Sequence, residues 1–373
     1  MNEKPLLTIA IPTYQRAGFL KNLLEVILPQ AHAMHGMIQV CISDNGSNDN
    51  TREIVLDAKK TYGELIIYHE HKKNTGHDNN MLTVMEMSLG KFVWLLGDDD
   101  MIAPHGIEKV IYGIKNFCNE HTGLVIMSHQ SYFIDEKTGQ EVVYFETKDS
   151  NKPSAYPIAT KDIMGLRSEN SFLSVLLFNN DFLKKVLQEE KAAIQEAMGT
   201  GYLHAFIAQL MLLKYSELQI MKYNEVIIRE ALHGYKFYVE DKFKLYYVGW
   251  NRFDNLLLSN KYMTPFYRTV IVREKKKLRR RALKEMALMK AFGTFNYVSF
   301  LGCINLFFNQ APLLDAVIFS VFFAIISLTP SWFIKSGYKM FIKVKYKNTW
   351  QTVWLHIVVS QEMMSKGERR LVY

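Results

Sequence analysis

The first half of the chain alternates between short apolar segments and longer stretches with helical spacing. Residues 6–11, 38–43 and 65–68 are short apolar segments, and each is followed by a polar loop and then by apolar residues three or four positions apart. Strands that alternate with helices in this way form parallel βαβ units. The pattern predicts an α/β fold with a doubly wound, mostly parallel sheet whose polar loops lie along one edge.

A fourth apolar segment ends at three consecutive carboxylates. Residues 91–97 run without alternation into Asp98, Asp99 and Asp100, as is typical of a strand covered on both faces. Ligands of open α/β sheets bind beyond the carboxyl ends of the strands, and hard cations such as Mg²⁺ and Mn²⁺ prefer oxygen ligands. The triplet is therefore a candidate metal site. The alternative is a solvated acidic turn before the helix that follows Pro104.

Four motifs in a fixed order carry a family resemblance. They are Ile-Pro-Thr-Tyr-Gln-Arg at 11–16, Ser-Asp-Asn-Gly-Ser-Asn-Asp-Asn-Thr at 43–51, Asn-Thr-Gly at 74–76, and Gly-Lys-Phe-Val-Trp-Leu-Leu-Gly-Asp-Asp-Asp at 90–100. Together they resemble the inverting family 2 glycosyltransferases of GT-A fold. The segment after Gly76 departs from the family's usual Ala-Arg-Asn and is similar to the O-antigen branch, the abequosyltransferase-like enzymes.

The resemblance implies a nucleotide-sugar pocket at the polar edge of the sheet. In it, Arg16 would lie near the donor phosphates and Asp44 would accept a hydrogen bond from a pyrimidine base. The residues to which the resemblance gives a nucleotide-sugar-binding role are Pro12, Thr13, Tyr14, Arg16, Asp44, Asn45, Asn74, Gly76, Asp78, Asp98 and His233. For His233 the alternative is a solvent-facing loop residue.

The acidic triplet matches the family's Asp-x-Asp element, which binds the ribose and, through a divalent metal, the diphosphate. The resemblance thus implies Mn²⁺ or Mg²⁺ at Asp98, Asp99 and Asp100. Counting back from Pro104 assigns the metal to Asp99, with Asp98 before it, whereas the Asp-x-Asp spacing selects Asp98 and Asp100. Both registers stay open.

An inverting transfer also needs a base that takes the proton of the acceptor hydroxyl. The family's usual acidic pair at a helix start has no counterpart around the helix predicted over 181–197. His204, just after a Gly-rich loop, and Glu196, just before it, are the candidate catalytic residues. The alternative for His204 is a hydrogen-bonded histidine of the core.

The C-terminal part of the chain differs in composition from the rest. The chain has 373 residues, of which 49% are hydrophobic, and a net charge of +8; the excess of Lys and Arg lies after residue 260. This shift predicts a catalytic domain over 1–260 and a basic, helical region over 261–373. Residues 316–334 are uncharged and approach the ~20 residues that span a bilayer, but Thr329 and Pro330 interrupt them.

Basic residues on both sides of that segment favour a membrane anchor on an anionic surface. A single membrane span and a buried helical bundle are the alternatives. Clustered basic residues also mark nucleic-acid-binding proteins, but no reader motif accompanies them here, so we expect no nucleic-acid partner.

The sequence thus predicts a metal-dependent inverting glycosyltransferase. It would transfer a sugar from a nucleotide-diphosphate sugar to a lipid-linked or oligosaccharide acceptor in bacterial surface polysaccharide synthesis, such as O-antigen, lipopolysaccharide or capsule. We expect it at the cytoplasmic face of the bacterial inner membrane. One alternative is a catalytically inactive nucleotide-sugar-binding or scaffold protein. A nicotinamide-dependent oxidoreductase is disfavoured, because no Gly-x-Gly-x-x-Gly follows the first strand.

Overall fold

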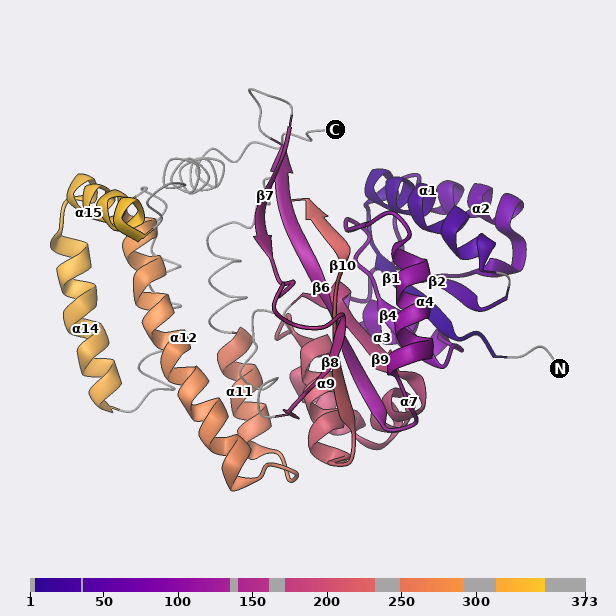
Figure 1. Cartoon of the computed structure of the whole chain (residues 1–373). Helices are drawn as coiled ribbons and strands as arrows, with labels where there is room; N and C mark the ends of the chain where they lie inside the picture. The colour runs from indigo at the N-terminus through magenta and orange to yellow at the C-terminus, as the bar shows by residue number, and fades with distance from the viewer. Residues whose placement is uncertain are drawn as a thin grey trace. The chain divides into compact units, whose positions relative to one another are not determined.

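The computed structural model describes residues 4–34, 36–134, 140–160, 172–231, 249–291 and 313–345 (Figure 1). The chain divides into two compact units. Unit 1 comprises Met1–Leu232 and Asn260–Tyr267, and unit 2 comprises His233–Ser259 and Arg268–Tyr373. The motifs at 11–16, 43–51, 74–76 and 90–100 all lie in unit 1.

The first half of unit 1 alternates strands and helices as predicted. Its elements are β1 (Leu7–Thr13), α1 (Ala17–Ala33), β2 (Ile38–Asp44), α2 (Thr51–Tyr62), the 3-10 turn η1 (Gly63–Leu65), β3 (Ile66–Glu70), α3 (His77–Met87) and β4 (Phe92–Leu95). β1 pairs in parallel with β2 and with β4, and β2 pairs in parallel with β3. Every residue of β1, β2 and β4 is buried, so these strands form the centre of the core.

The second half of unit 1 completes a mixed sheet. Its elements are β5 (Met101–Ile102), α4 (Gly106–Phe117), β6 (Thr122–Ile134), β7 (Glu141–Glu146), β8 (Ala155–Ile158), the 3-10 turn η2 (Leu173–Val175), β9 (Leu176–Asn179), α7 (Asn180–Glu189), α8 (Lys191–Ala197), α9 (Leu203–Lys214) and β10 (Gln219–Ala231). The strand order is β3-β2-β1-β4-β9-β6-β10-β5, with β7 on β6 and β8 on β10. The α/β prediction is confirmed. In addition, β9 lies antiparallel between β4 and β6.

The helix predicted over 181–197 is in fact two helices, α7 and α8, which meet at Glu190. The Glu190 side chain is buried and accepts hydrogen bonds at 2.6 Å from Lys214 and at 2.7 Å from the hydroxyl of Tyr262. This inward-facing carboxylate fixes the junction, because a buried charge is retained where it is paired and hydrogen-bonded.

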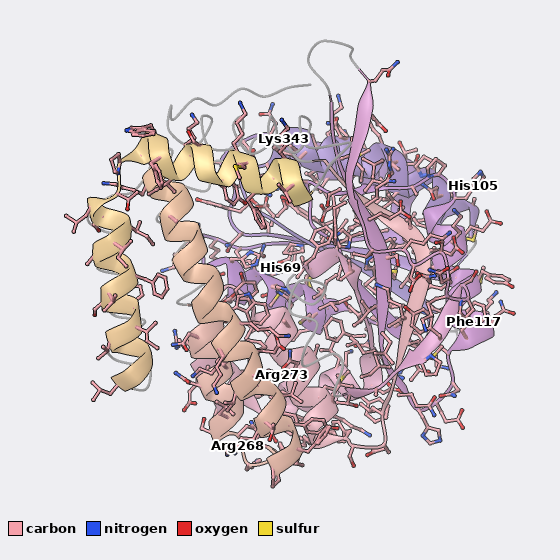
Figure 2. All side chains as sticks on the ribbon, turned by 60° about the vertical axis from the view of Figure 1, so that its left-hand side comes forward. His69, His105, Phe117, Arg268, Arg273 and Lys343 are labelled. Carbon is pink, nitrogen blue, oxygen red and sulfur yellow. The ribbon has the colours of Figure 1, made fainter. Side chains whose placement is uncertain are left out.

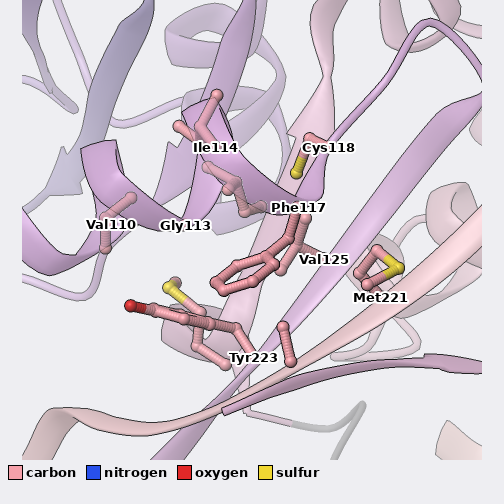
Figure 3. Close-up of a pocket in the computed structure, with 11 residues that line it drawn as sticks. Val110, Gly113, Ile114, Phe117, Cys118, Val125, Met221 and Tyr223 are labelled. Carbon is pink, nitrogen blue, oxygen red and sulfur yellow. The ribbon is translucent and has the colours of Figure 1, made fainter.

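A small pocket lies between α4 and the sheet (Figure 3). Its walls are mainly apolar, and they include Val110, Phe117 and Met221. The hydroxyl of Tyr223, a polar group at its margin, already donates to the carbonyl of Lys109 at 2.9 Å. A ligand site needs a few polar groups that fix orientation, so this pocket is best described as a gap in core packing.

Unit 2 is helical in the part of it that the structure describes. Its helices are α11 (Trp250–Ser259), α12 (Pro265–Ala291, whose first residues belong to unit 1), α14 (Leu313–Leu328) and α15 (Ser331–Lys345). Within the described ranges no single helix combines the length and the apolar composition of a membrane span. α14 and α15 meet those criteria only as a pair, and their axes are bent by 107°; Figure 1 shows the corner between them.

Candidate active site

The site lies at the carboxyl ends of the neighbouring strands β1 and β4. The two strands are in parallel register up to the pair Ala10 and Leu95. β1 continues to Thr13, whereas β4 ends at Leu95, three residues before Asp98. The Thr13 hydroxyl donates to Oδ2 of Asp98 at 2.7 Å, and both side chains are buried. The structure therefore brings the first and the fourth motif into direct contact, at the edge where the sequence predicted it.

Arg16, from the loop between β1 and α1, pairs with the acidic triplet. Its Nη1 lies 3.0 Å from Oδ1 of Asp98 and 2.7 Å from Oδ2 of Asp99. Only 4% of Asp98 is exposed, and burial raises the pKa of its carboxyl group to about 6 against the opposing effect of the Arg16 charge. The guanidinium thus compensates two neighbouring carboxylates that would otherwise repel each other.

Asp100 has a different partner. Its carboxylate is hydrogen-bonded by the hydroxyl of Ser174, which also accepts from the backbone N–H of Gly97 at 2.9 Å. Gly97 leaves room for this arrangement, because a Cβ there would lie 2.7 Å from Oδ2 of Asp100 and 3.2 Å from Oδ1 of Asp99. Sequence reasoning did not single out Ser174, which lies 74 residues away from Asp100.

The donor set can be tested for a divalent cation. In the described ranges no three His, Cys, Asp or Glu side chains converge so as to hold a metal by themselves. Mg²⁺, however, is commonly bound by one or two carboxylates together with the phosphates of a substrate. Asp98 and Asp99 already turn an oxygen each toward one cationic nitrogen. These two side chains therefore fit a hard cation shared with a diphosphate.

The second and third motifs also meet. The amide of Asn45 accepts from the backbone N–H of Thr75 at 2.8 Å and donates to the amide oxygen of Asn74 at 3.0 Å. That same oxygen accepts from the N–H of Gly76, so the loop before α3 is attached to the end of β2. Gly46 allows the two loops to approach this closely, since a Cβ there would lie 2.8 Å from the carbonyl carbon of Lys73.

Asp44 is buried at the end of β2. Its carboxylate accepts from the backbone N–H of Ser47 at 2.9 Å and from the hydroxyl of Tyr68 at 3.0 Å. Burial, and then the Asp44 charge, raise the pKa of Tyr68, which keeps that hydroxyl a donor. Asp44 therefore organises the loop that follows it, and this is the turn role that an Asx residue commonly has.

Asn80 connects three of these segments and was not among the residues predicted for the site. From α3, its amide donates to the carbonyls of Thr13 at 3.1 Å and of Ser43 at 2.9 Å, and it accepts from the Ser43 hydroxyl at 2.7 Å. All three residues are buried. The only sequence signal is an Asn at a position where a helix facing the sheet would otherwise carry an apolar residue.

The two remaining predicted site residues of the first motif, Pro12 and Tyr14, differ in exposure. Pro12 is buried in β1 and lies opposite Ser43 of β2. Tyr14 is 37% exposed, and its hydroxyl accepts from the side chain of Gln15 at 3.1 Å. An exposed aromatic ring beside the strand ends offers a surface on which a base can stack.

The candidate catalytic residues lie on either side of a glycine-rich turn. Glu196 is exposed near the end of α8, whereas His204 is buried in the first turn of α9. Between them, the N–H of Gly199 donates to Oδ2 of Asp78 at 2.6 Å. Asp78 therefore ties the start of α3 to the turn that leads to His204. His233 lies outside the described residues.

Comparison with known proteins gives a family match. Residues 8–170 match the family model described as glycosyl transferase family 2. Abequosyltransferase RfbV of Salmonella typhimurium is 37% identical over 98 residues, which are 26% of this chain and 29% of that protein. A GalNAc(5)-diNAcBac-PP-undecaprenol beta-1,3-glucosyltransferase of Campylobacter jejuni is 23% identical over 195 residues, 52% of this chain and 57% of that protein. The chain thus spans less than two thirds of these curated relatives.

Solved structures share the fold over more of the chain. TarS 1-349 of S. aureus in complex with UDP-GlcNAc aligns with a TM-score of 0.56 at 14% identity, covering 83% of this chain and 82% of that one. The mannosyltransferase PcManGT of Pyrobaculum calidifontis, in complex with GDP-Man and Mn²⁺, aligns with a TM-score of 0.52 at 12% identity, covering 98% and 89%. These likenesses show the GT-A fold. The family match and the meeting of all four motifs agree: over residues 8–170 this chain is similar to glycosyl transferase family 2.

Proposed function

We propose that this chain is an enzyme that transfers a sugar from a nucleotide-diphosphate sugar to a glycan acceptor, with inversion at the transferred carbon. The observation that carries the proposal is the contact of Thr13 with Asp98 at 2.7 Å, because it joins the first and the fourth of the motifs to which the family resemblance gives a donor-binding role. This contact lies within the segment that matches the family model.

The donor would lie along the edge formed by the ends of β1, β2 and β4. The ring of Tyr14 is exposed there for stacking against a base, and the loop fixed by Asn45 and Asn74 borders the same edge. The likenesses to structures that hold UDP-GlcNAc and GDP-Man support a nucleotide-diphosphate sugar as the donor class. Arg16 would move from the carboxylates toward the phosphates, since both are anions that bind a guanidinium.

Asp98 and Asp99 would hold Mn²⁺ or Mg²⁺. When bound, such a cation offsets the negative charge that develops on a leaving diphosphate. The Mn²⁺ in the mannosyltransferase structure supports this choice of cofactor. The Ser174 hydroxyl, through its hydrogen bond to Asp100, keeps the third carboxylate aligned with the loop that carries the other two.

His204 would act as the general base. Its imidazole would take the proton from the acceptor hydroxyl as that oxygen attacks the anomeric carbon, and a buried position shields it from bulk water. The hydrogen bond from Gly199 to Asp78 holds the preceding turn. Glu196 is the second candidate, and its exposed carboxylate would reach an acceptor from the solvent side.

We further propose a lipid-linked or oligosaccharide acceptor in bacterial surface polysaccharide synthesis, at the cytoplasmic face of the inner membrane. The name of the Campylobacter relative supports a lipid-linked glycan as the acceptor, because that name contains PP-undecaprenol. The basic residues of the C-terminal helices support a place at an anionic membrane surface.

The test is a donor screen with the purified full chain. UDP-, GDP-, CDP- and dTDP-sugars are compared with and without Mn²⁺ for a rise in melting temperature, because a ligand that binds the native state stabilises it. Donors that stabilise the protein are then assayed for release of the nucleotide diphosphate. We expect stabilisation by one base class and metal-dependent turnover that is lost in Asp99→Ala. Asp57→Ala, which removes an exposed carboxylate of α2 paired with Lys60, is the matched control.

The same screen tests the inactive-scaffold alternative. One observation favours that alternative, namely that the candidate metal ligands Asp98 and Asp99 are both already paired with Arg16. Stabilisation by a donor without any turnover would support a protein that only binds nucleotide sugars. If none of the donors stabilises the protein or is consumed, the proposed function is wrong.

A further inference from the structure

Helix α14 exposes an apolar surface over about half of its circumference. Seven large apolar side chains along it are between 43% and 85% exposed; they are Leu313, Val317, Ile318, Val321, Phe322, Ile325 and Leu328. Ala316 and Phe319 are buried on the opposite side. Because contiguous exposed apolar surface is rare on soluble monomers and marks interaction sites, this face needs a partner.

Two hydroxyl groups, one in α14 and one just after it, are hydrogen-bonded to backbone carbonyls of the helix. Ser320 Oγ donates to the carbonyl of Ala316 at 3.0 Å, and Thr329 Oγ1 donates to the carbonyl of Ile325 at 2.7 Å. Polar groups enter a hydrocarbon medium at low cost only when they are hydrogen-bonded internally. These two hydroxyls are therefore compatible with an apolar, water-poor environment around α14.

Helix α15 adds charge beside a second apolar stripe. Phe333, Met340 and Val344, seven and four residues apart, share one side of the helix and are 60% to 70% exposed. Lys335, Lys339 and Lys343 recur every four residues and form a separate row, of which Lys343 is labelled in Figure 2. Ile342, on another side of α15, is buried. A row of lysines next to an apolar stripe is the pattern of helices that lie in a membrane interface.

Length excludes a simple crossing by α14. Its 16 residues extend about 24 Å at 1.5 Å per residue, less than the ~30 Å of a hydrocarbon core. After the sharp corner, α15 runs nearly across the axis of α14, at a bend of 107°. Trp332, which is 68% exposed, lies at this corner, and tryptophan favours the boundary between headgroups and acyl chains.

We infer that α14 and α15 bind together to the surface of a bilayer that contains anionic phospholipid. The exposed face of α14 and the stripe of Phe333, Met340 and Val344 enter the acyl boundary, and the lysine row contacts lipid phosphates. The lysines select this partner over an uncharged apolar surface, because each adds electrostatic attraction to anionic lipid. The inference deepens the membrane part of the proposed function by naming the segments and the lipid, and it does not depend on sugar transfer.

The test measures binding of the full-length protein to vesicles of phosphatidylcholine with and without phosphatidylglycerol. We expect binding only with phosphatidylglycerol, and weaker binding in high salt because salt screens the attraction. Combined Lys335→Gln, Lys339→Gln and Lys343→Gln should weaken binding by about fivefold per lysine, on the order of a hundredfold in all. The matched control removes three lysines of α1 and α2, at positions 21, 59 and 60, and should bind like the wild type.

A second measurement reports on insertion. Brominated lipids quench tryptophans that reach the acyl chains, so part of the fluorescence of the bound wild type should be quenched. Trp332→Phe should lose that quenched part while it still binds. Three results would each overturn the inference. They are equal binding to both vesicle types, an equal loss of binding in the α1 and α2 control, and quenching that Trp332→Phe leaves unchanged. Stabilisation by nucleotide sugars, read in parallel, reports on the proposed function separately.

Discussion

Arg16 supplies the positive charge of the acidic site, and replacing it by glutamine tests whether Asp98 and Asp99 need that charge. Glutamine keeps the polar chain but removes the charge that lies 3.0 Å from Asp98 and 2.7 Å from Asp99. The two carboxylates then face each other without a cation. Burial already raises the pKa of Asp98 to about 6, so the site has little remaining capacity to solvate a second negative charge.

The size of the effect follows from burial. Removing one partner of a buried ion pair costs about 3–5 kcal/mol. Arg16 is only half-buried, with 43% of its side chain exposed, so solvent screening reduces the expected loss in unfolding free energy to about 1–3 kcal/mol at neutral pH. The matched control is Arg52→Gln. It removes a guanidinium that lies 3.0 Å from Glu70 on an exposed surface, and its expected change is below about 1 kcal/mol.

Metal addition separates this explanation from a general loss of packing. If Arg16 and a divalent cation use the same oxygens of Asp98 and Asp99, Mn²⁺ should bind Arg16→Gln more tightly than it binds the wild type in the absence of nucleotide. A tenfold tighter dissociation constant adds about 1.4 kcal/mol at saturating metal. Calorimetric titration with Mn²⁺ and melting curves at increasing Mn²⁺ concentration both measure this gain.

Two results would refute the reasoning. The first is an Arg16→Gln variant that is as stable as the wild type without metal, because the carboxylates would then not need the guanidinium. The second is an equal or smaller gain from Mn²⁺ in the variant, because Arg16 would then not compete for the metal site. Arg52→Gln should match the wild type in both measurements.

Three further predictions concern the scaffold around the site. Asn80→Ala removes three buried hydrogen bonds and should lower the unfolding free energy by about 3 kcal/mol, at about 1 kcal/mol for each bond. Denaturant titration measures this against Asn79→Ala, which affects an exposed amide. Burial and then the Lys222 charge lower the pKa of His129 from 6.5 to about 4 in the folded protein. Between these two values the unfolded chain binds a proton that the folded protein does not. The unfolding free energy is therefore fully present above pH 6.5 and falls by about 3 kcal/mol as the pH drops to 4. Relative to the wild type, His129→Gln should therefore show a flatter fall in stability over that range. Gly90→Ala should prevent stable folding, seen as loss of soluble protein, because its Cβ would lie 2.5 Å from a backbone nitrogen of β1.

The repeating part of the fold was predictable because its signals are local. Each βα unit in residues 6–95 shows its own change of hydrophobic period, and parallel strands place their carboxyl ends on one edge. The contact of Thr13 with Asp98 follows from these two facts once β1 and β4 are neighbours. The contact of Asn45 with Asn74 follows in the same way from the pairing of β2 with β3.

The other half of the site depends on a strand whose position no local signal gives. β9 lies antiparallel between β4 and β6, and the 3-10 turn just before it brings Ser174 to Asp100 and to the N–H of Gly97. A short apolar segment in the sequence predicts a strand but neither its direction nor its neighbours. Sequence reasoning could therefore find the acids without finding what positions the third one.

The position of Arg16 shows a related limit. A basic residue just after the first strand can pair either with donor phosphates or with the acids that follow the fourth strand, and the motif is the same in both cases. Which pairing forms depends on how strongly the carboxylates need a cation, and that need arises from the burial of Asp98. The burial of Asp98 depends on how the folded chain packs around the Thr13 end of β1. The position of the arginine near the site could therefore be predicted from the sequence, but its partner could not. The choice has a functional consequence, because a donor that attracts Arg16 would at the same time free Asp98 and Asp99 for the metal, and the two ligands would then bind cooperatively.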